Sequence, residues 1–264
     1  MMSTLFVAWQ QPDNGEWIPV AKLERRDGIY RFSYTQGVAR AENFQPFSGM
    51  RQLNVTYESP SLFPLFANRL ISKSRPEFKD YVRWLGLSDM ADDPMAILAL
   101  TGGIRGTDSI ELFQPPVVSA DGHYQVDFFA RSLSHLPKPA VEHIGTMHKG
   151  DRLFLMRDGQ NDFDPLALAL RTLTPSYFLG YCPKYYVRDL GVLLADPECS
   201  LQVQVKCVNL DAPMNMRLFC SASATVPANF SPLGRENDFQ PITGNTPAKW
   251  EELSAGLTAA FQAY

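Results

Sequence analysis

Turn residues recur at short intervals near the start of the chain, and this spacing constrains the fold more than any other feature. The apolar segment 5–9 is followed by the turn formers of residues 12–15, and segment 17–23 runs into Asp27-Gly28. An Asp-Gly pair favours the positive φ angles of a tight hairpin turn. The alternate positions of segment 30–34 are all aromatic, which places three rings on one face of a strand. We therefore predict three antiparallel strands joined by short turns.

Helical periodicity follows these strands. Residues 62–70 carry apolar side chains at helical spacing, and Ser74 is expected to cap a second helix. A third helix is predicted from Asp93-Pro94 to the glycines at 102–103, because Pro suits a first turn and Gly a helix end. A short strand is expected at residues 109–113. This mixture predicts a small α+β domain.

The pair Pro115-Pro116 marks the expected domain boundary, and a β-rich region follows it. Strands are predicted at residues 124–130, 152–157, 166–171, 177–181, 201–208 and 216–222, with helical segments at 138–144 and 184–195. In the tail, Trp250, Leu253 and Leu257 predict a final helix. The expected fold class is therefore α+β, with domains at residues 1–116 and 117–225 and a tail at 226–264.

Composition restricts the class of protein. Of the 264 residues, 45% are hydrophobic and 20% are charged, which is typical of a globular chain. No apolar run reaches the roughly 20 residues of a membrane span, and the first residues do not resemble a signal peptide, so we expect no membrane contact and a cytoplasmic location. The net charge of −4 argues against electrostatic binding of duplex nucleic acid over a broad surface. A site that recognises a few nucleotides is compatible with it.

The densest polar cluster, residues 157–164, contains three carboxylates. An EF-hand loop beginning at Asp158 would need Gly and Glu where Phe163 and Ala169 stand, so a calcium loop is excluded. Paired carboxylates for metal-assisted hydrolysis remain a further interpretation, although no nucleophile or base lies nearby in the sequence. The simplest alternative is a turn in which carboxylate and amide oxygens accept backbone N–H bonds.

No other pattern predicts a metal, a cofactor or a reaction. The four histidines fall within residues 123–148, but none of them has the spacing of a helical zinc site. The glycines of residues 101–107 lack the Gly-Lys-Ser/Thr ending of a phosphate loop. We therefore expect a protein that is not an enzyme and that holds no cofactor and no metal.

A group of basic side chains falls around the first two predicted helices. The group consists of Arg69, Lys73, Arg75, Lys79 and Arg83. One interpretation is a surface that docks a protein partner or faces phosphates, and the other is a solvated helical face. The sequence leaves both open.

The polar cluster belongs to a longer pattern. Residues 150–158 (GDRLFLMRD), 161–168 (NDFDPLAL) and 179–184 (LGYCPK) resemble, in order and spacing, the HIRAN family. The resemblance implies a small β-barrel related to OB folds that binds single-stranded DNA, especially a 3′ end. This expectation suits roles in DNA repair, mobile-element control or phage defence in a bacterial-type protein.

The resemblance also implies roles for individual residues. Phe163 matches the ring that stacks on a base, and Asp164 matches the carboxylate that accepts a hydrogen bond from the 3′-hydroxyl. Asn161, Tyr181 and Lys184 match positions that line the site, with Lys184 placed to meet a phosphate.

The family's second stacking platform, an Arg-Tyr pair, would fall near Ser134-His135. Neither residue type is present there, and His135 is the ring available. Residues 121–189 carry eight acidic and eight basic side chains, which predicts weak, salt-sensitive binding. A second hypothesis follows: a protein-interaction or regulatory module with no nucleic-acid ligand.

The first domain resembles the N-terminal subdomain of HipA-type toxin kinases. The resemblance rests on segments 21–23 (AKL), 30–34 (YRFSY) and 63–70 (FPLFANRL). It implies a fold and a protein-docking role. No catalytic-loop or metal-binding Asp motif follows, so it does not imply phosphoryl transfer.

Overall fold

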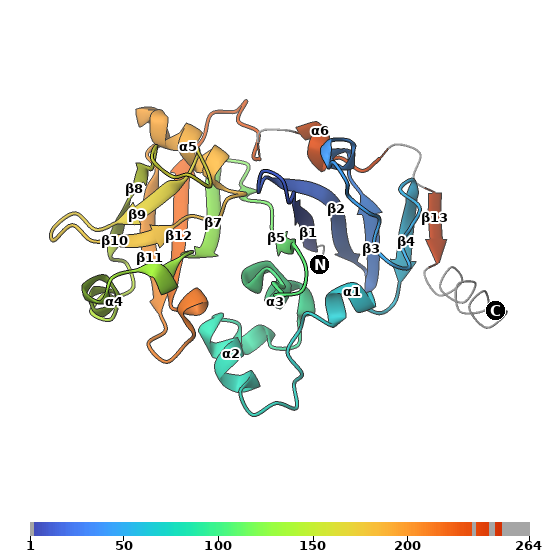
Figure 1. Cartoon of the computed structure of the whole chain (residues 1–264), viewed down its shortest axis with the longest axis horizontal. Coiled ribbons are helices and arrows are strands. Elements are labelled where there is room, and N and C mark those ends of the chain that lie inside the picture. The colour runs from blue at the N-terminus through green and yellow to red at the C-terminus, as the bar shows by residue number, and fades with distance from the viewer. Residues whose placement is uncertain (1–2, 234–235, 243–245, 250–264) are drawn as a thin grey trace. The chain divides into compact units, whose positions relative to one another are not determined.

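The computed structural model describes residues 3–233, 236–242 and 246–249, and these form two compact units. The first unit contains residues 3–78 and 89–114 together with the described residues from 236 onward. The second contains residues 79–88 and 115–233. Figure 1 labels the helices and strands of both. The final helix predicted around Trp250 lies outside the described residues.

The first unit is built on a six-stranded sheet in the order β13-β4-β3-β2-β1-β5. Its strands are β1 (Ser3–Gln10), β2 (Trp17–Arg26), β3 (Ile29–Tyr34), β4 (Val55–Ser59), β5 (Ile110–Phe113) and β13 (Thr246–Lys249). Neighbours are antiparallel except β13, which runs parallel to β4. The predicted hairpin is present, since Asp27 and Gly28 both have positive φ between β2 and β3. Strands β4 and β13 were not predicted.

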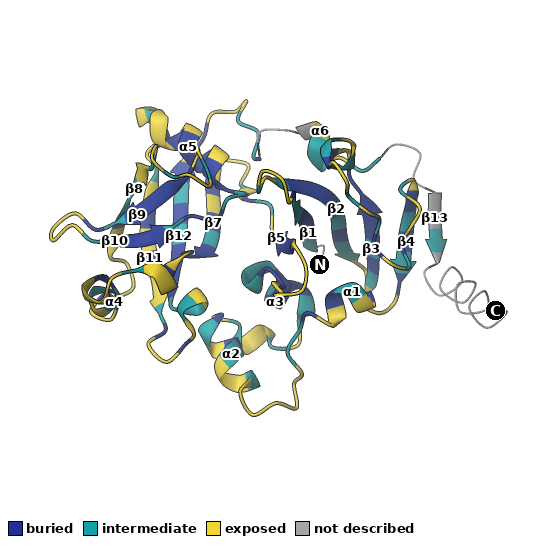
Figure 2. Ribbon diagram, viewed as in Figure 1, coloured by how far each residue is buried: buried dark blue, intermediate teal, exposed yellow. Residues whose placement is uncertain are grey.

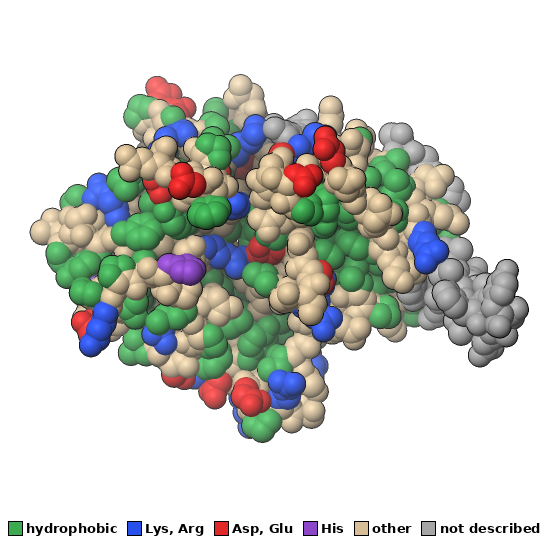
Figure 3. Space-filling model, viewed as in Figure 1, with side chains coloured by type: hydrophobic (Ala, Val, Ile, Leu, Met, Phe, Trp, Pro, Cys, Tyr) green, Lys and Arg blue, Asp and Glu red, His purple; other side chains and the backbone are tan. Residues whose placement is uncertain are grey.

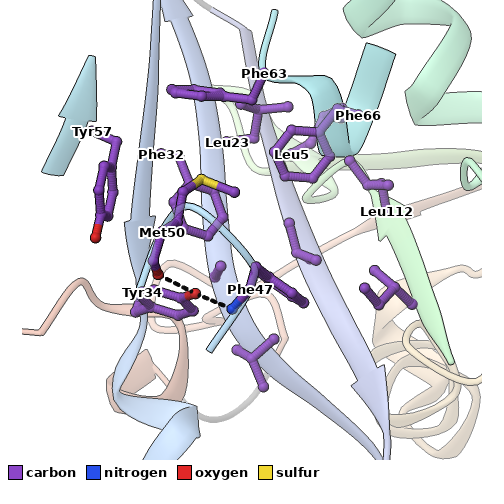
Figure 4. Packing of buried hydrophobic residues seen from close by; sticks show 14 of the residues in the cluster. Leu5, Leu23, Phe32, Tyr34, Phe47, Met50, Tyr57, Phe63, Phe66 and Leu112 are labelled. Carbon is purple, nitrogen blue, oxygen red and sulfur yellow. Dashed lines mark hydrogen bonds between the residues drawn. The ribbon is translucent and has the colours of Figure 1, made fainter. Parts of the chain in front are cut away.

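Aromatic side chains fill the core of the first unit, as Figure 4 shows. Phe32 and Tyr34 are fully buried on β3, and their rings meet edge to face at 5.0 Å between centroids. The Tyr34 hydroxyl donates to the Met50 carbonyl oxygen at 2.7 Å and accepts from the Phe47 N–H at 2.7 Å. Both hydrogen bonds satisfy a buried hydroxyl and fix the loop after β3 against the sheet.

The helices of the first unit are short. The helix expected at residues 62–70 is a single turn, α1 (Pro64–Ala67). Helix α3 (Pro94–Thr101) forms as predicted, because the Asp93 carboxylate accepts from the Met95 N–H at 2.9 Å and Gly102 ends it in the left-handed conformation. Two 3₁₀ turns, η1 (Gln36–Arg40) and η2 (Ser88–Met90), and the short helix α6 (Glu236–Phe239) are also present. The Phe239 ring of α6 contacts the Phe6 ring of β1, with 4.7 Å between the two centroids.

Helix α2 (Phe78–Trp84) belongs mainly to the second unit, although the sequence places it in the first domain. The Asn209 side-chain N–H donates to the Trp84 carbonyl oxygen at 2.8 Å, and Arg83 lies 2.6 Å from the Asp211 carboxylate. Long-range bonds of this kind leave no periodic signal in the sequence, so segment 79–88 cannot be assigned by pattern.

The second unit holds a seven-stranded antiparallel sheet in the order β10-β9-β8-β11-β12-β7-β6. Its strands are β6 (Val117–Val118), β7 (His123–Phe129), β8 (Arg152–Arg157), β9 (Leu168–Arg171), β10 (Phe178–Tyr181), β11 (Gln202–Val208) and β12 (Leu218–Thr225). Apart from β6, each matches a predicted strand to within a few residues. The fold class α+β is confirmed.

The β-barrel expected for this unit is not confirmed. One isolated antiparallel bridge, between Arg131 and Tyr181, joins the continuation of β7 to β10. Its two hydrogen bonds are 2.8 and 3.0 Å long. A closed barrel needs a continuous ladder at the seam, and the described residues provide a single pair there.

The second unit also contains the helices α4 (Lys138–Ile144) and α5 (Val187–Ala195) and three short 3₁₀ turns, η3 (Leu133–His135), η4 (Pro197–Cys199) and η5 (Met214–Met216). Figure 2 shows α5 with buried residues on one side and exposed residues on the other, the pattern of an amphipathic helix. Helix α5 begins three residues later than predicted. No helix among the described residues is long and apolar enough to cross a membrane.

Candidate nucleic-acid interface

The connection between β8 and β9 is a hydrogen-bonded turn that contains three of the predicted site residues. At its base, the Asp158 N–H donates to the Ala167 carbonyl oxygen at 3.0 Å. Within it, Asn161 Oδ1 accepts from the backbone N–H groups of Phe163 and Asp164, both at 3.0 Å. Asp164 Oδ1 accepts from the Leu166 N–H at 2.9 Å. The side chains of Asn161 and Asp164 therefore order the turn, as the Asx-turn interpretation predicts.

The turn presents Phe163 to solvent. Phe163 is 84% exposed, the largest value among the large hydrophobic residues that the structure describes. Lys184 donates from Nζ to the Phe163 carbonyl oxygen at 3.3 Å, which ties the turn to the segment after β10. An exposed aromatic ring on an ordered turn contributes little to the stability of the fold, and it is available to stack on a ligand.

Tyr181 and Asp158 are joined directly. The Tyr181 hydroxyl donates to Asp158 Oδ2 at 2.6 Å. This bond raises the pKa of Tyr181 and lowers the pKa of Asp158, because the donated hydrogen stabilises the carboxylate and would be lost on ionisation of the phenol. Since the hydroxyl is engaged, a ligand would meet the ring of Tyr181.

A β-bulge at Gly180 decides which way Tyr181 points. Gly180 has φ of +101°, and the register shifts between Phe178 and Tyr181. A Cβ at position 180 would lie 2.3 Å from the Arg131 carbonyl oxygen, so only glycine fits. The extra residue puts Tyr181 on the same face as Phe178, and their rings meet at 5.0 Å between centroids.

An arginine–tyrosine pair does exist beside this bulge, although the sequence offers none near Ser134-His135. The Arg131 guanidinium donates to the Tyr185 hydroxyl at 3.1 Å. The two residues are 54 positions apart, so neither spacing nor composition could have paired them. His135 is exposed on η3, and among the described residues no interaction joins it to the turn.

One of the five predicted docking residues is buried. The Arg69 side chain is 1% exposed, with Nη2 2.6 Å from the Asp108 carboxylate and Nη1 bonded to the Gly103 carbonyl oxygen at 2.8 Å. It holds a loop in place and cannot dock a partner, which corrects the prediction for this residue. The other four residues, Lys73, Arg75, Lys79 and Arg83, are exposed; Lys73 pairs with Asp92, and Arg83 pairs with Asp80 and Asp211.

The described residues contain no group of three or more His, Cys, Asp or Glu side chains that could hold a metal ion. On the face drawn in Figure 3, Lys and Arg side chains of the described residues are scattered among hydrophobic and other groups, without one broad basic surface. Cys182, Cys199 and Cys220 are buried and Cys207 is exposed, all as free thiols.

Comparison with known proteins adds little. No protein-family model and no curated protein match the chain. Among solved structures, one from Lactobacillus plantarum, a structural genomics target, is 20% identical with a TM-score of 0.31, over 39% of this chain and 97% of that one. The HIRAN domain of human HLTF is 14% identical with a TM-score of 0.29, over 42% of this chain and 81% of that one. Likenesses this weak assign no role to any residue, and none of the comparisons supports the resemblance to HipA-type kinases.

Proposed function

We propose that the second unit binds single-stranded DNA at its 3′ end, through the turn between β8 and β9, and that the chain acts by binding without catalysing a reaction. The observation that carries the proposal is the 84% exposure of Phe163 on a turn that three side-chain hydrogen bonds to backbone N–H groups hold in place. Every nucleobase has a π-face, and stacking on an aromatic ring contributes about 1–3 kcal/mol per base.

The polar groups next to Phe163 are suited to bind the 3′ end of a DNA strand. Asp164 uses Oδ1 for the Leu166 N–H, and Oδ2 has no hydrogen-bond partner among the described residues. That oxygen can accept a hydrogen bond from a terminal hydroxyl. Lys184 engages one of its three donor hydrogens with the Phe163 carbonyl oxygen, which leaves two for a phosphate.

The charge of the region sets the expected strength. Equal numbers of acidic and basic side chains in residues 121–189 leave few phosphates that can be neutralised. Affinity then depends mainly on stacking and on the end group, and we expect a dissociation constant in the micromolar range or weaker, with binding that weakens further as the salt concentration rises.

The test is a fluorescence titration of the full chain with short oligonucleotides that differ only in a 3′-hydroxyl or a 3′-phosphate, at two salt concentrations. We expect the 3′-hydroxyl strand to bind at least fivefold more tightly, and Asp164→Ala to remove that preference. Equal affinity for the two ends would contradict end recognition. Absence of binding to either strand at both salt concentrations would contradict the proposal as a whole.

A further inference from the structure

A row of cationic and aromatic side chains crosses the exposed face of three neighbouring strands. Arg171 on β9 lies directly opposite Phe154 on β8 and also directly opposite Phe178 on β10. Residues paired in this way project from the same face of a sheet. Arg152, two positions before Phe154 on β8, projects from that face as well. The row of Arg152, Phe154, Arg171 and Phe178 faces away from the core, since the intervening Leu153 is buried.

The two guanidinium groups are held at the surface by one ring. Arg152 Cζ lies 5.0 Å from the centroid of the Phe154 ring, and Arg171 Cζ lies 5.6 Å from it. These are cation–π distances. Phe178 is 38% exposed at the other end of the row. The result is a surface on which planar cations and aromatic rings alternate.

Neither guanidinium has a carboxylate partner among the described residues. Arg171 donates to the Thr172 carbonyl oxygen at 3.2 Å, and Arg152 is exposed. Two carboxylates of the same unit are engaged elsewhere: Asp127 with Lys206, and Asp158 with Tyr181. The row therefore offers two uncompensated positive charges to a negatively charged ligand.

The row is continuous with the turn that carries Phe163. The Phe178 ring touches the Tyr181 ring at 5.0 Å between centroids, and Tyr181 is bonded to Asp158 at the base of that turn. A ligand leaving Phe163 would pass over Tyr181 and Phe178 to reach the two arginines.

We propose that the row of Arg152, Phe154, Arg171 and Phe178 is a second stacking platform for the single-stranded DNA whose 3′ end the turn binds, an inference that rests on the proposed function. Unpaired bases stack on aromatic rings and on guanidinium planes, and phosphates pair with the positive charge. An apolar protein partner would leave both charges unpaired. None of the four side chains can accept a hydrogen bond from a ribose 2′-hydroxyl, so the row gives RNA no added acceptor contact, and the assignment to DNA follows from the proposed function.

The span of the row sets the number of bases it holds. Adjacent strands lie about 4.8 Å apart, so β10 to β8 covers roughly 10 Å. Stacked bases repeat about every 3.4 Å, and the row therefore accommodates about three nucleotides beyond those at the turn.

The experiment compares 3′-hydroxyl oligodeoxythymidylates of four and eight nucleotides on the full chain, by fluorescence anisotropy. The wild type should bind the octamer about tenfold more tightly than the tetramer. Arg152→Ala/Arg171→Ala should abolish that gain and leave tetramer affinity within about twofold. Phe163→Ala should weaken both lengths, because it acts on the primary site.

The matched control is Arg51→Ala/Arg188→Ala, which also removes two exposed guanidinium groups. Arg51 is in the first unit, and Arg188 is on α5, which packs against the side of β8 that carries Arg157. This variant should keep the length dependence. Thermal unfolding of each variant separates lost binding from lost folding.

The outcomes distinguish the two proposals. If tetramer binding depends on Phe163 while the double arginine variant keeps the tenfold gain, the platform is overturned and the proposed function stands. If the wild type binds neither length, both are overturned. Tighter binding of the octaribonucleotide than of the octadeoxynucleotide would overturn the assignment to DNA.

Discussion

The Tyr181 hydroxyl donates a hydrogen bond of 2.6 Å to Asp158 Oδ2, and this single contact joins strand β10 to the first residue after β8. The Gly180 bulge makes it feasible, since without the extra residue Tyr181 would project from the opposite face of the sheet. The contact holds the base of the turn at one side, while Lys184 ties the Phe163 carbonyl oxygen at the other.

Replacing Tyr181 by Phe tests this contact. Loss of the donated hydrogen should raise the pKa of Asp158 toward the ordinary value of an aspartate, because the hydrogen bond from Tyr181 is the largest cause of its depression. A carboxyl carbon NMR titration measures this directly. An unchanged Asp158 titration in Tyr181→Phe would show that the bond does not persist in solution. The isosteric ring keeps the contact with Phe178, so folding should be retained.

Replacing Phe163 by Ala should weaken single-stranded DNA binding by roughly 5- to 150-fold, the equivalent of one lost stacking contact. Because Phe163 is 84% exposed, the melting temperature should change by no more than about 2 °C. Anisotropy and calorimetry on the same sample provide both values. Leu173, 58% exposed, provides the matched control, and Leu173→Ala should leave affinity unchanged. A large loss of stability in Phe163→Ala would mean that the ring packs against the protein.

Replacing Gly180 by Ala should destabilise the second unit. The left-handed conformation strains any residue with a Cβ by about 1–3 kcal/mol, and the added carbon would collide with the Arg131 carbonyl oxygen. Urea unfolding measures the loss. Gly159→Ala is the control, since no atom lies within 4 Å of a Cβ at that position and its φ is not positive. Equal stability of the two variants would contradict the bulge geometry.

Stability should depend on pH through Asp189, a buried carboxylate on α5. Burial raises its pKa from 3.8 to about 6, although both of its oxygens accept from the Leu233 N–H, at 2.8 and 2.9 Å. Between about pH 4 and pH 6 the folded state therefore binds more protons than the unfolded chain, so this group stabilises the fold as the pH falls and opposes it at neutral pH. The cost at pH 7 is on the order of 3 kcal/mol.

Asp189→Asn isolates this effect, because the amide oxygen still accepts from the Leu233 N–H without a charge. The variant should be more stable than the wild type at pH 7, and the difference should shrink toward pH 4.5. Urea midpoints at the two pH values measure it. If the difference in stability between the wild type and the variant is the same at both pH values, Asp189 does not titrate in this range.

Local patterns predicted most elements of the fold. The alternating rings of β3, the Asp27-Gly28 turn and the Asp93 cap of α3 each depend on neighbours within a few residues, and all three are present. Strand β4 was missed because residues 55–59 are short and carry Glu58 and Ser59, which read as polar loop. Helix α1 ended early, since Asn68 and Arg69 leave the helix and the Arg69 guanidinium binds Asp108 and Gly103 instead.

Local sequence patterns were sufficient to predict most of the strands, the main turns between them and the Asx-type turn at Asn161, because each rests on backbone conformations and hydrogen bonds between residues close in the chain. The burial of Arg69, the hydrogen bond from Tyr181 to Asp158, and the shared face of Arg152, Phe154, Arg171 and Phe178 appear only in the three-dimensional structure. Those relationships depend on strand register and on one bulge. A shift of register by a single residue would turn every side chain to the other face, and segment 152–157, with apolar side chains on both faces, has no alternating pattern that fixes that choice.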